Sequence, residues 1–259
     1  MNIFVVIPFL AGYILIGLSQ GVSHASAGFI ELSASSMELT QKKYSNDSRE
    51  VYLVAMMHIG ERNFYEKLAA SFPAESSIVL MEGVTDRKKL LKYHLNYQKF
   101  ADFLGIDTQS DYFNPASREI ECKYADLDMS DLSPGTVKFI NKCARIHSQG
   151  FTSQESLKEM FSQGADDKEF ELFKTDIVGK RNIHLLEQIA AGLKTHRIVV
   201  VPWGAYHMPG LESALLCQGF IQSDLKKWDV VKYQTIFHSL VYKWQSKNAP
   251  SLNETETSK

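Results

Sequence analysis

The sequence has few cysteines for its length, three in 259 residues, and their number and spacing exclude several classes of protein. Cys122, Cys143 and Cys217 allow at most one internal disulfide, so the chain is not a small disulfide-stapled scaffold. No two of them form a C-x-x-C pair, which argues against a thiol redox enzyme and a cysteine-rich zinc site. Whether Cys122 and Cys143 pair stays open. Cys217 falls in an expected helix, where a packed core thiol is a more ordinary role than a nucleophile.

An excess of charge of either sign is also missing. Lys and Arg total 28 against 30 for Asp and Glu, a formal net charge of −2. This balance creates no basic field that would recruit nucleic acid or an anionic membrane surface. No internal repeat of fixed period occurs beyond a strand followed by a helix. With 44% hydrophobic residues the chain can bury one sizeable core, expected as a single domain over residues 51–240.

The first 27 residues have the pattern of an export signal. Residues 3–18 are almost uninterrupted apolar sequence, and a stretch of small residues ends at Ala25-Ser26-Ala27. This predicts a secretory signal peptide cleaved after Ala27, and therefore a periplasmic or extracellular protein. Because the segment before the apolar run lacks Lys and Arg, an uncleaved membrane anchor stays open as the alternative.

Short apolar runs alternate with helical patterns in the rest of the chain, which predicts an α/β fold. Strands are expected at 51–57, 78–81, 198–201 and 228–237, with a weaker one at 123–127. Helices are expected at 63–72, 86–104, 134–146, 153–161, 167–193 and 211–216. Apolar runs of four residues are typical of strands covered on both faces, so we expect a mostly parallel or mixed central sheet flanked by helices. The helices between 134 and 161 are expected to form an insertion over the carboxyl ends of the strands. Regular structure is not expected in a flexible lead at 28–50, a turn-rich stretch at 106–119 and a disordered tail at 241–259.

Three of the expected strands end on side chains that carry chemistry. His58 follows the first strand, Glu82 follows the second, and His207 lies just past the strand at 198–201. Parallel strands bring their carboxyl ends to one edge, where ligands bind in open α/β sheets, so the three are expected to meet. Two imidazoles and a carboxylate are a common ligand set for Zn, Mn, Co or Fe, and water bound to such a metal becomes a nucleophile near neutral pH. The pattern predicts a divalent metal site, with backbone-satisfied structural histidines as the alternative.

Two further residues are expected close to this edge. The weaker strand ends in Asp126, Asp128 and Asp131, and turn and N-cap roles before a helix explain all three, with a place at this edge as the alternative for Asp126. On the helix expected at 167–193, an apolar row continues into Arg181. A guanidinium in such a row either snorkels at its edge or points into a site.

Together these motifs resemble the TraB, GumN and Tiki family (TraB/PrgY-like), whose members carry two G-x-x-H motifs. The second motif stands here as Gly204-Ala205-Tyr206-His207, and the first reads Ala55-Met56-Met57-His58, with alanine in place of glycine. The family also has a glutamate that closes the second strand, matched by Glu82, and an arginine on the helix before the last motif, matched by Arg181 with Asn182. The resemblance covers residues 51–220.

The resemblance implies an exported or membrane-linked protein with an α/β fold similar to the EreA, ChaN and TraB proteins. Members of the group are described as metal-dependent proteases of extracellular ligands or as inhibitors of peptide pheromones, and a related branch is similar to haem-binding and esterase proteins. We therefore expect a metal-dependent, peptidase-like hydrolase of a peptide or protein substrate. Glu82, Arg181 and Asn182 are the expected catalytic residues, with Arg181 stabilising an oxyanion or binding a substrate carboxylate, and Asp126, Gly204 and Tyr206 supporting them. The alternative is a non-catalytic protein that sequesters a peptide or haem in the same cleft.

Overall fold

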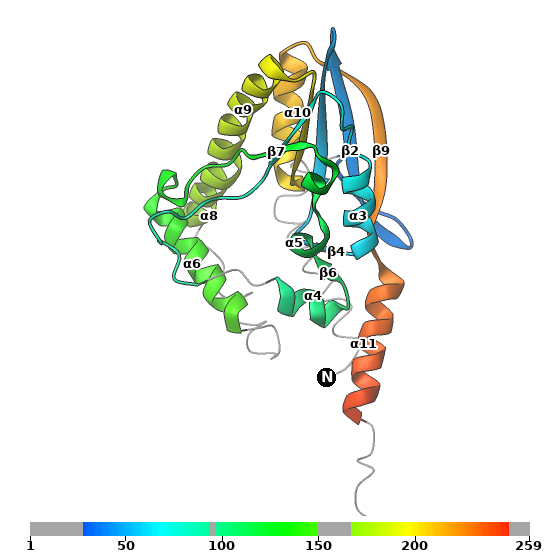
Figure 1. The fold of residues 1–259 in the computed structure, drawn as a ribbon. Coiled ribbons are helices and arrows are strands. Elements are labelled where there is room, and N and C mark those ends of the chain that lie inside the picture. Colours follow the sequence, from blue (N-terminus) through cyan, green and yellow to red (C-terminus); the bar gives the residue numbers. More distant parts are fainter. Residues whose placement is uncertain (1–27, 94–96, 150–166, 249–259) are drawn as a thin grey trace, which may run out of the picture.

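The computed structural model describes residues 28–93, 97–149 and 167–248, and these form an α/β fold (Figure 1). One mixed sheet of seven strands has the order β1-β2-β3-β8-β5-β7, and β9 pairs with β2 as well. The expected fold class is confirmed. Residues 1–27, which carry the expected export signal, lie outside the described residues.

The parallel part of the sheet contains β3 (Arg49–Met56), β8 (Ile198–Gly204), β5 (Ser77–Met81) and β7 (Glu121–Tyr124). The apolar runs of the sequence form β3, β8 and β5, as predicted. Val199, Val200 and Val201 have no exposed surface, because helices cover both faces of this part of the sheet. All four strands run in the same direction, so their carboxyl ends lie along one edge.

The antiparallel part consists of β1 (Ile30–Leu32), β2 (Ser36–Asn46) and β9 (Ile221–Lys232). One edge of β2 pairs with β9, and the other pairs first with β1 and then with β3. The flexible lead expected at 28–50 is therefore wrong, since Phe29, Leu39 and Tyr44 are fully buried. Much of β2 is polar, and pairing along both of its edges is a long-range property that its local pattern does not carry.

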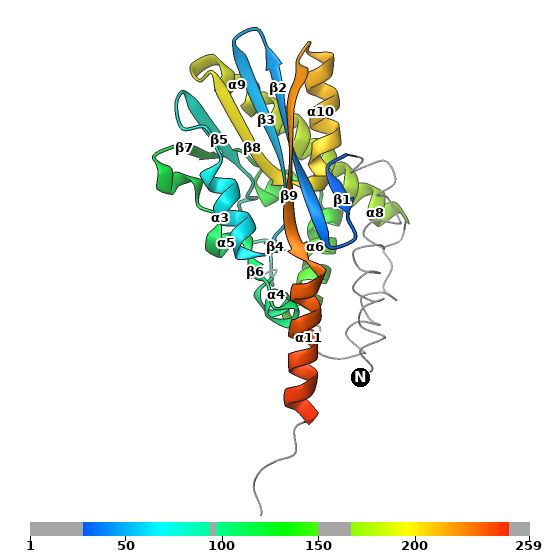
Figure 2. The same cartoon turned by 90° about the vertical axis from the view of Figure 1, so that its right-hand side faces the viewer.

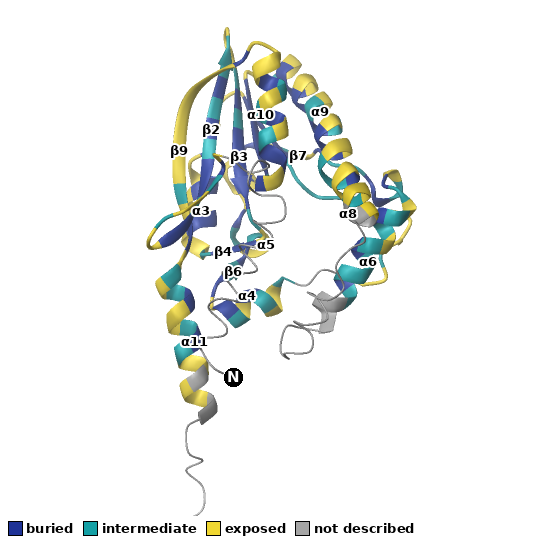
Figure 3. Cartoon of the chain, turned by 180° about the vertical axis from the view of Figure 1, so that it is seen from behind, coloured by how far each residue is buried: buried dark blue, intermediate teal, exposed yellow. Residues whose placement is uncertain are grey.

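Helices cover the sheet on both faces, with α9 (Arg181–Thr195) and α10 (Met208–Cys217) behind the strands and α3 (Arg62–Ala70) in front of them (Figure 2). The α9 helix packs closely, since a Cβ atom on Gly192 would lie 3.2 Å from Val199 Cγ2. On the other face, α3 buries an apolar stripe that includes Phe64 and Leu68. Burial is concentrated in the sheet between these layers, while β9 is mostly exposed (Figure 3).

Of the helix expected at 86–104, the described residues form only the last part, α4 (Gln98–Leu104), which ends at Gly105 with φ +71°. Upstream, the Asp86 carboxylate accepts hydrogen bonds from the N–H groups of Leu90 and Leu91, which holds that stretch as a turn. The region 106–119, expected to be irregular, contains short elements: β6 (Asp107–Thr108), which pairs with β4 (Ile59–Gly60), then α5 (Gln109–Tyr112) and the 3₁₀ turn η1 (Pro115–Arg118).

The insertion begins with η2 (Met129–Asp131) and α6 (Pro134–Gln149). Asp128 and Asp131 form a capping box at η2, so their interpretation as capping residues is confirmed. The helix expected at 153–161 lies outside the described residues. The long helix expected at 167–193 is formed by α8 (Asp167–Lys174), a π-helical turn η3 (Thr175–Lys180) and α9.

The C-terminal prediction is wrong beyond Lys232, because β9 gives way to the helix α11 (Tyr233–Asn248), which projects from the body of the molecule (Figure 1). Ile236 and Leu240, one helical turn apart, are buried, and their spacing fits a helix better than the strand expected to 237. The tail expected from 241 is thus helical to Asn248, and residues 249–259 lie outside the described ranges. None of the helices described has the length and apolar character needed to cross a membrane.

Candidate functional site

The carboxyl ends of the parallel strands bring together most of the side chains singled out in the sequence. Glu82 follows β5, Asp126 lies just past β7, and His207 ends the 3₁₀ turn η4 (Ala205–His207) after β8. Arg181 is the first residue of α9, directly after the π-helical turn. Such turns are frequent at functional sites.

Arg181 is the centre of this cluster. Its Nε donates to Asp126 Oδ1 at 2.9 Å, and its Nη2 donates to Asp126 Oδ2 and to Glu82 Oε1, both at 2.6 Å. Its Nη1 lies 3.2 Å from His207 Nε2. Four of the five guanidinium N–H groups are therefore committed within the protein, and the side chain is only 6% exposed. Arg181 is held as a structural cation, which leaves it little capacity to bind a substrate carboxylate or an oxyanion.

The two carboxylates accept hydrogen bonds through all four of their oxygens. Asp126 also accepts from the N–H groups of Gly83 and Leu127, and Glu82 Oε2 accepts from Gly204 N at 2.7 Å. Burial alone would raise the pKa of Glu82, but Arg181, with His207 and His58, holds it below its ordinary value. One cation thus faces two anions, and Glu82 is the member that reaches the surface, with 15% of its side chain exposed against 0% for Asp126.

His207 is neutral, and its hydrogen bonds select one tautomer. A guanidinium can only donate, so Nε2 accepts from Arg181, and Nδ1 carries the proton that it donates to Asn182 Oδ1 at 2.7 Å. Burial lowers the pKa of His207 to about 4, although the charge of Glu82 pulls it upward. Asn182 also donates from Nδ2 to the carbonyl oxygen of His207 at 3.1 Å, so it fixes both the ring and the backbone of this residue.

Trp203 completes the support of the cluster. It is fully buried, and its Nε1 donates to the carbonyl oxygen of Leu80. Its ring stands edge-on to His207 at 5.1 Å, and Arg181 Cζ lies 5.0 Å from its centroid. These contacts hold the guanidinium and the imidazole on one aromatic surface.

His58 is close to the cluster but outside its hydrogen bonds. Its side chain is exposed and stacks on Tyr97, with ring centroids 4.6 Å apart. Its backbone is fixed, because Gln109 N donates to its carbonyl oxygen. It lies near enough for its charge to act on both Glu82 and His207, but in the described structure no hydrogen bond or ion pair joins it to either. His58 is thus the accessible imidazole of the site.

The arrangement does not fit the expected divalent metal site. The single lone pair of His207 Nε2 faces Arg181 Nη1, and Arg181 Nη2 donates to Glu82 Oε1, so an ion shared by these two atoms would have to displace both hydrogen bonds. Among the described residues, no three His, Cys, Asp or Glu side chains are grouped as ligands of one ion. Ligation by His207 through Nε2 would break its hydrogen bond with Arg181 Nη1. The residues present therefore do not fit a bound divalent ion.

The remaining residues expected at the site are placed as follows. Gly204 has φ −48°, and a Cβ atom there would lie at an ordinary 3.5 Å from Glu82 Oε2, so neither conformation nor space demands glycine. An alanine in the corresponding first motif is compatible with this geometry. Tyr206 is 43% exposed, and Met56 is buried in the core. Cys217, expected to be a packed core thiol, is exposed and free.

Two site residues were not anticipated from the sequence. Trp203 stands directly before the second motif, where a large aromatic beside a strand-end turn was a usable signal. Tyr97 lies in a stretch that reads locally as a helix, and nothing in its neighbourhood distinguishes it. Burial, together with the charge of Glu82, raises the pKa of Tyr97 to about 12, so its hydroxyl stays protonated at neutral pH.

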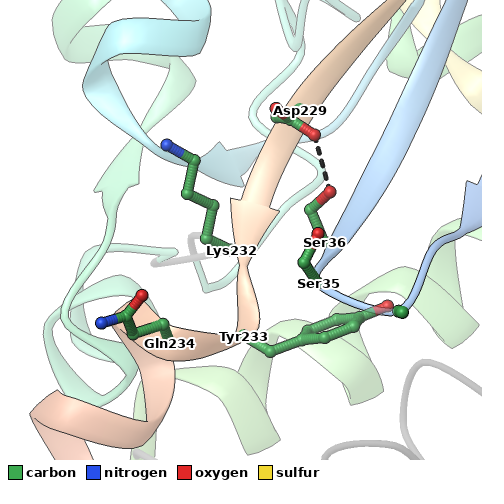
Figure 4. Close-up of a pocket in the computed structure, with 7 residues that line it drawn as sticks. Ser35, Ser36, Asp229, Lys232, Tyr233 and Gln234 are labelled. Atoms are coloured by element: carbon green, nitrogen blue, oxygen red, sulfur yellow. Dashed lines mark hydrogen bonds between the residues drawn. The ribbon is translucent and has the colours of Figure 1, made fainter.

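A separate hollow lies on the antiparallel side of the sheet, between the start of β2 and the end of β9 (Figure 4). Ser36 Oγ donates to Asp229 Oδ1 at 2.6 Å, which joins the two strands, while Lys232 points away from this pair. None of the residues singled out in the sequence lines it. The Ser36–Asp229 hydrogen bond links β2 to β9, and this structural role explains both side chains.

Comparisons with protein-family models, with curated proteins and with solved structures found no match to this chain. The resemblance to the TraB, GumN and Tiki family therefore rests on the motifs quoted above.

Proposed function

We propose that the chain is a hydrolase of amide or ester bonds in which His58 is the general base. One observation carries the proposal: an accessible imidazole lies at the carboxyl edge of the parallel strands, within electrostatic range of Glu82, a carboxylate that stays ionised. This edge is where open α/β sheets place their chemistry.

In the proposed reaction, the neutral His58 imidazole takes a proton from water as the water oxygen attacks the substrate carbonyl carbon. When the tetrahedral intermediate collapses, the imidazolium returns that proton to the leaving nitrogen or oxygen, so His58 ends the cycle neutral. The negative charge of Glu82 stabilises the imidazolium while it exists. Stacking on Tyr97 restricts the ring so that little freedom is lost in the transition state.

In this proposal Arg181 acts on Glu82 rather than on the substrate. By neutralising part of the buried charge, it keeps the Glu82 carboxylate ionised and fixes its orientation. His207 and Asn182 orient Arg181 in turn. The expected roles of Arg181 and Asn182 in catalysis thus become positioning roles.

The family resemblance supports a peptide or protein as the substrate, and the apolar segment at 3–18 supports export to the periplasm or the cell exterior. Mass spectrometry of protein purified from an exporting host should find an N-terminus at Gly28. Intact residues 1–27 in a membrane fraction would indicate the anchored alternative.

The decisive experiment compares three proteins, wild type, His58→Ala and His238→Ala, on a panel of peptide and ester substrates before and after dialysis against a chelator. His238 is an exposed histidine on α11 and serves as the matched control. We expect His58→Ala to lower kcat/KM by about 10²- to 10⁴-fold, while His238→Ala and chelation change little.

Activity that chelation abolishes and Zn, Mn or Co restores would overturn the metal-free mechanism and favour the ligand set expected from the sequence. A protein that turns over none of the panel but retains a peptide or haem would overturn the hydrolase itself. The sequestering alternative would then account for the site.

A further inference from the structure

Gly210, in the first turns of α10, touches the site through one residue of the neighbouring helix. A Cβ atom built on Gly210 would lie 2.7 Å from Asn182 Nδ2 and 3.9 Å from Asn182 Cγ. The first distance is too short for real atoms, so any larger residue here must displace the Asn182 amide. The missing side chain of Gly210 is what gives that amide its place between α9 and α10.

Both polar atoms of the Asn182 side-chain amide are engaged in hydrogen bonds with His207. Nδ2 donates to the His207 carbonyl oxygen at 3.1 Å, and Oδ1 accepts from His207 Nδ1 at 2.7 Å. Both bonds are buried, so an amide that moved would leave His207 Nδ1–H and its own polar atoms without partners, at a cost typical of unsatisfied buried groups. The neutral His207 ring can then regain a partner in two ways, by moving its proton to Nε2 or by rotating.

Either change of the His207 ring breaks its hydrogen bond with Arg181. The hydrogen bonds have a single direction, from Arg181 Nη1 to His207 Nε2 and from His207 Nδ1 to Asn182 Oδ1. A proton on Nε2 would face a guanidinium N–H, donor against donor. We propose that Gly210 is a positioning residue, which holds His207 in its Nδ1–H tautomer through Asn182 and thereby keeps Arg181 aligned with Glu82. Its consequence for turnover rests on the hydrolase proposed above, whereas the tautomer does not.

The test is a set of nitrogen-detected NMR spectra of protein labelled at the histidine side chains, recorded near neutral pH. Wild type should show His207 with its proton on Nδ1 and that proton protected from exchange. Gly210→Ala should lose this signature. Gly179→Ala is the matched control, because a Cβ atom there meets nothing within 4 Å, and it should keep the wild-type spectrum.

A double-mutant comparison separates this relay, the chain of contacts from Gly210 through Asn182 to His207, from a general destabilisation of α10. Asn182→Ala removes the amide that Gly210 accommodates, so adding Gly210→Ala to it should cause no further change in the His207 resonances. An additional change in the double variant would overturn the relay, as would a Gly210→Ala protein that folds and keeps the protected Nδ1 proton. If Gly210→Ala does not fold, the relay requires the Asn182→Ala, Gly210→Ala double variant to fold and match Asn182→Ala. None of these spectra depends on turnover. The proposal for Gly210 can therefore be confirmed even if the protein proves not to be a hydrolase, and a hydrolase can be confirmed even if the proposal for Gly210 is wrong.

Discussion

The guanidinium of Arg181 holds the Asp126 carboxylate through two parallel hydrogen bonds, Nε to Oδ1 at 2.9 Å and Nη2 to Oδ2 at 2.6 Å. This bidentate pair links the start of α9 to the end of β7, two elements far apart in the sequence. It also determines where the remaining N–H groups of Arg181 point, because the guanidinium is planar.

Arg181→Lys should therefore damage the site although it keeps the charge. An ammonium cannot match the planar fork, so buried acceptors on Asp126, Glu82 or His207 lose partners. We expect the free energy of unfolding to fall by about 1–3 kcal/mol in urea titrations, and hydrolysis to fall further than this loss explains. Arg62→Lys is the matched control, since Arg62 makes an exposed i,i+4 pair with Glu66 that contributes little. Equal effects of the two substitutions would contradict the central role of Arg181.

Stability should depend on pH through His207. Its pKa is about 4 in the folded chain, against an ordinary value of 6.5, so the unfolded chain binds the proton first as the pH falls. The free energy of unfolding should therefore decrease between about pH 6.5 and pH 4, by up to about 3 kcal/mol from this group. Urea titrations at several pH values would measure the slope. The slope should flatten in His207→Gln, and an unchanged slope in that variant would assign the effect to other groups.

The N-terminal strands should be essential for folding. Phe29 is fully buried, so Phe29→Ala should lower the free energy of unfolding by about 3–5 kcal/mol. Leu32→Ala, at a side chain that is 48% exposed, should cost far less. Thermal or urea unfolding of both variants measures the difference, and similar stabilities would show that the segment is not part of the core.

Thiol reactivity should follow exposure. Cys217 is exposed on α10, whereas burial raises the pKa of the Cys122 and Cys143 thiols. An alkylating reagent at neutral pH should modify Cys217 first, as read by peptide mass spectrometry. Preferential modification of Cys122 would contradict the packing of β7.

The parallel strands were the most predictable part of the fold, because a run such as Ile198 to Val201 buries both faces and shows it locally. The antiparallel strands were not, since Lys42 is buried beside Phe29 with its ammonium paired to Glu212, a residue 170 positions away. A lysine in such a strand is expected to be exposed as long as the residue that pairs with it is unknown. The helix α11 was missed for a related reason: Trp228 to Phe237 is rich in strand-forming residues, and only the tertiary contacts of Ile236 and Leu240 show where the strand stops.

For the site, the order of strand-end residues correctly indicated that Glu82, Asp126 and His207 gather at one edge, and the apolar row of the helix indicated Arg181. It could not indicate which of them pair. Two histidines and a glutamate suggest a metal only while the nearest cation is unknown, and here that cation is Arg181, supplied by a helix 99 residues beyond Glu82. The positions of these residues along the chain thus predicted the cluster. Which of them pair depends on charge compensation, and that follows from distances in the folded structure.

The placement of β9 beside β2 has a consequence for how the chain folds. Tyr44 of β2 pairs with Gln222 of β9, so one edge of an inner strand stays without its partner until the chain has been synthesised past residue 222. Contacts of such large sequence separation form slowly because a long loop must close first. Until then β2 presents an open edge, the kind of surface on which incomplete chains aggregate. Folding should thus be limited by the return of the C-terminal strand, and truncations that remove β9 should accumulate as insoluble protein even though the site residues are all present.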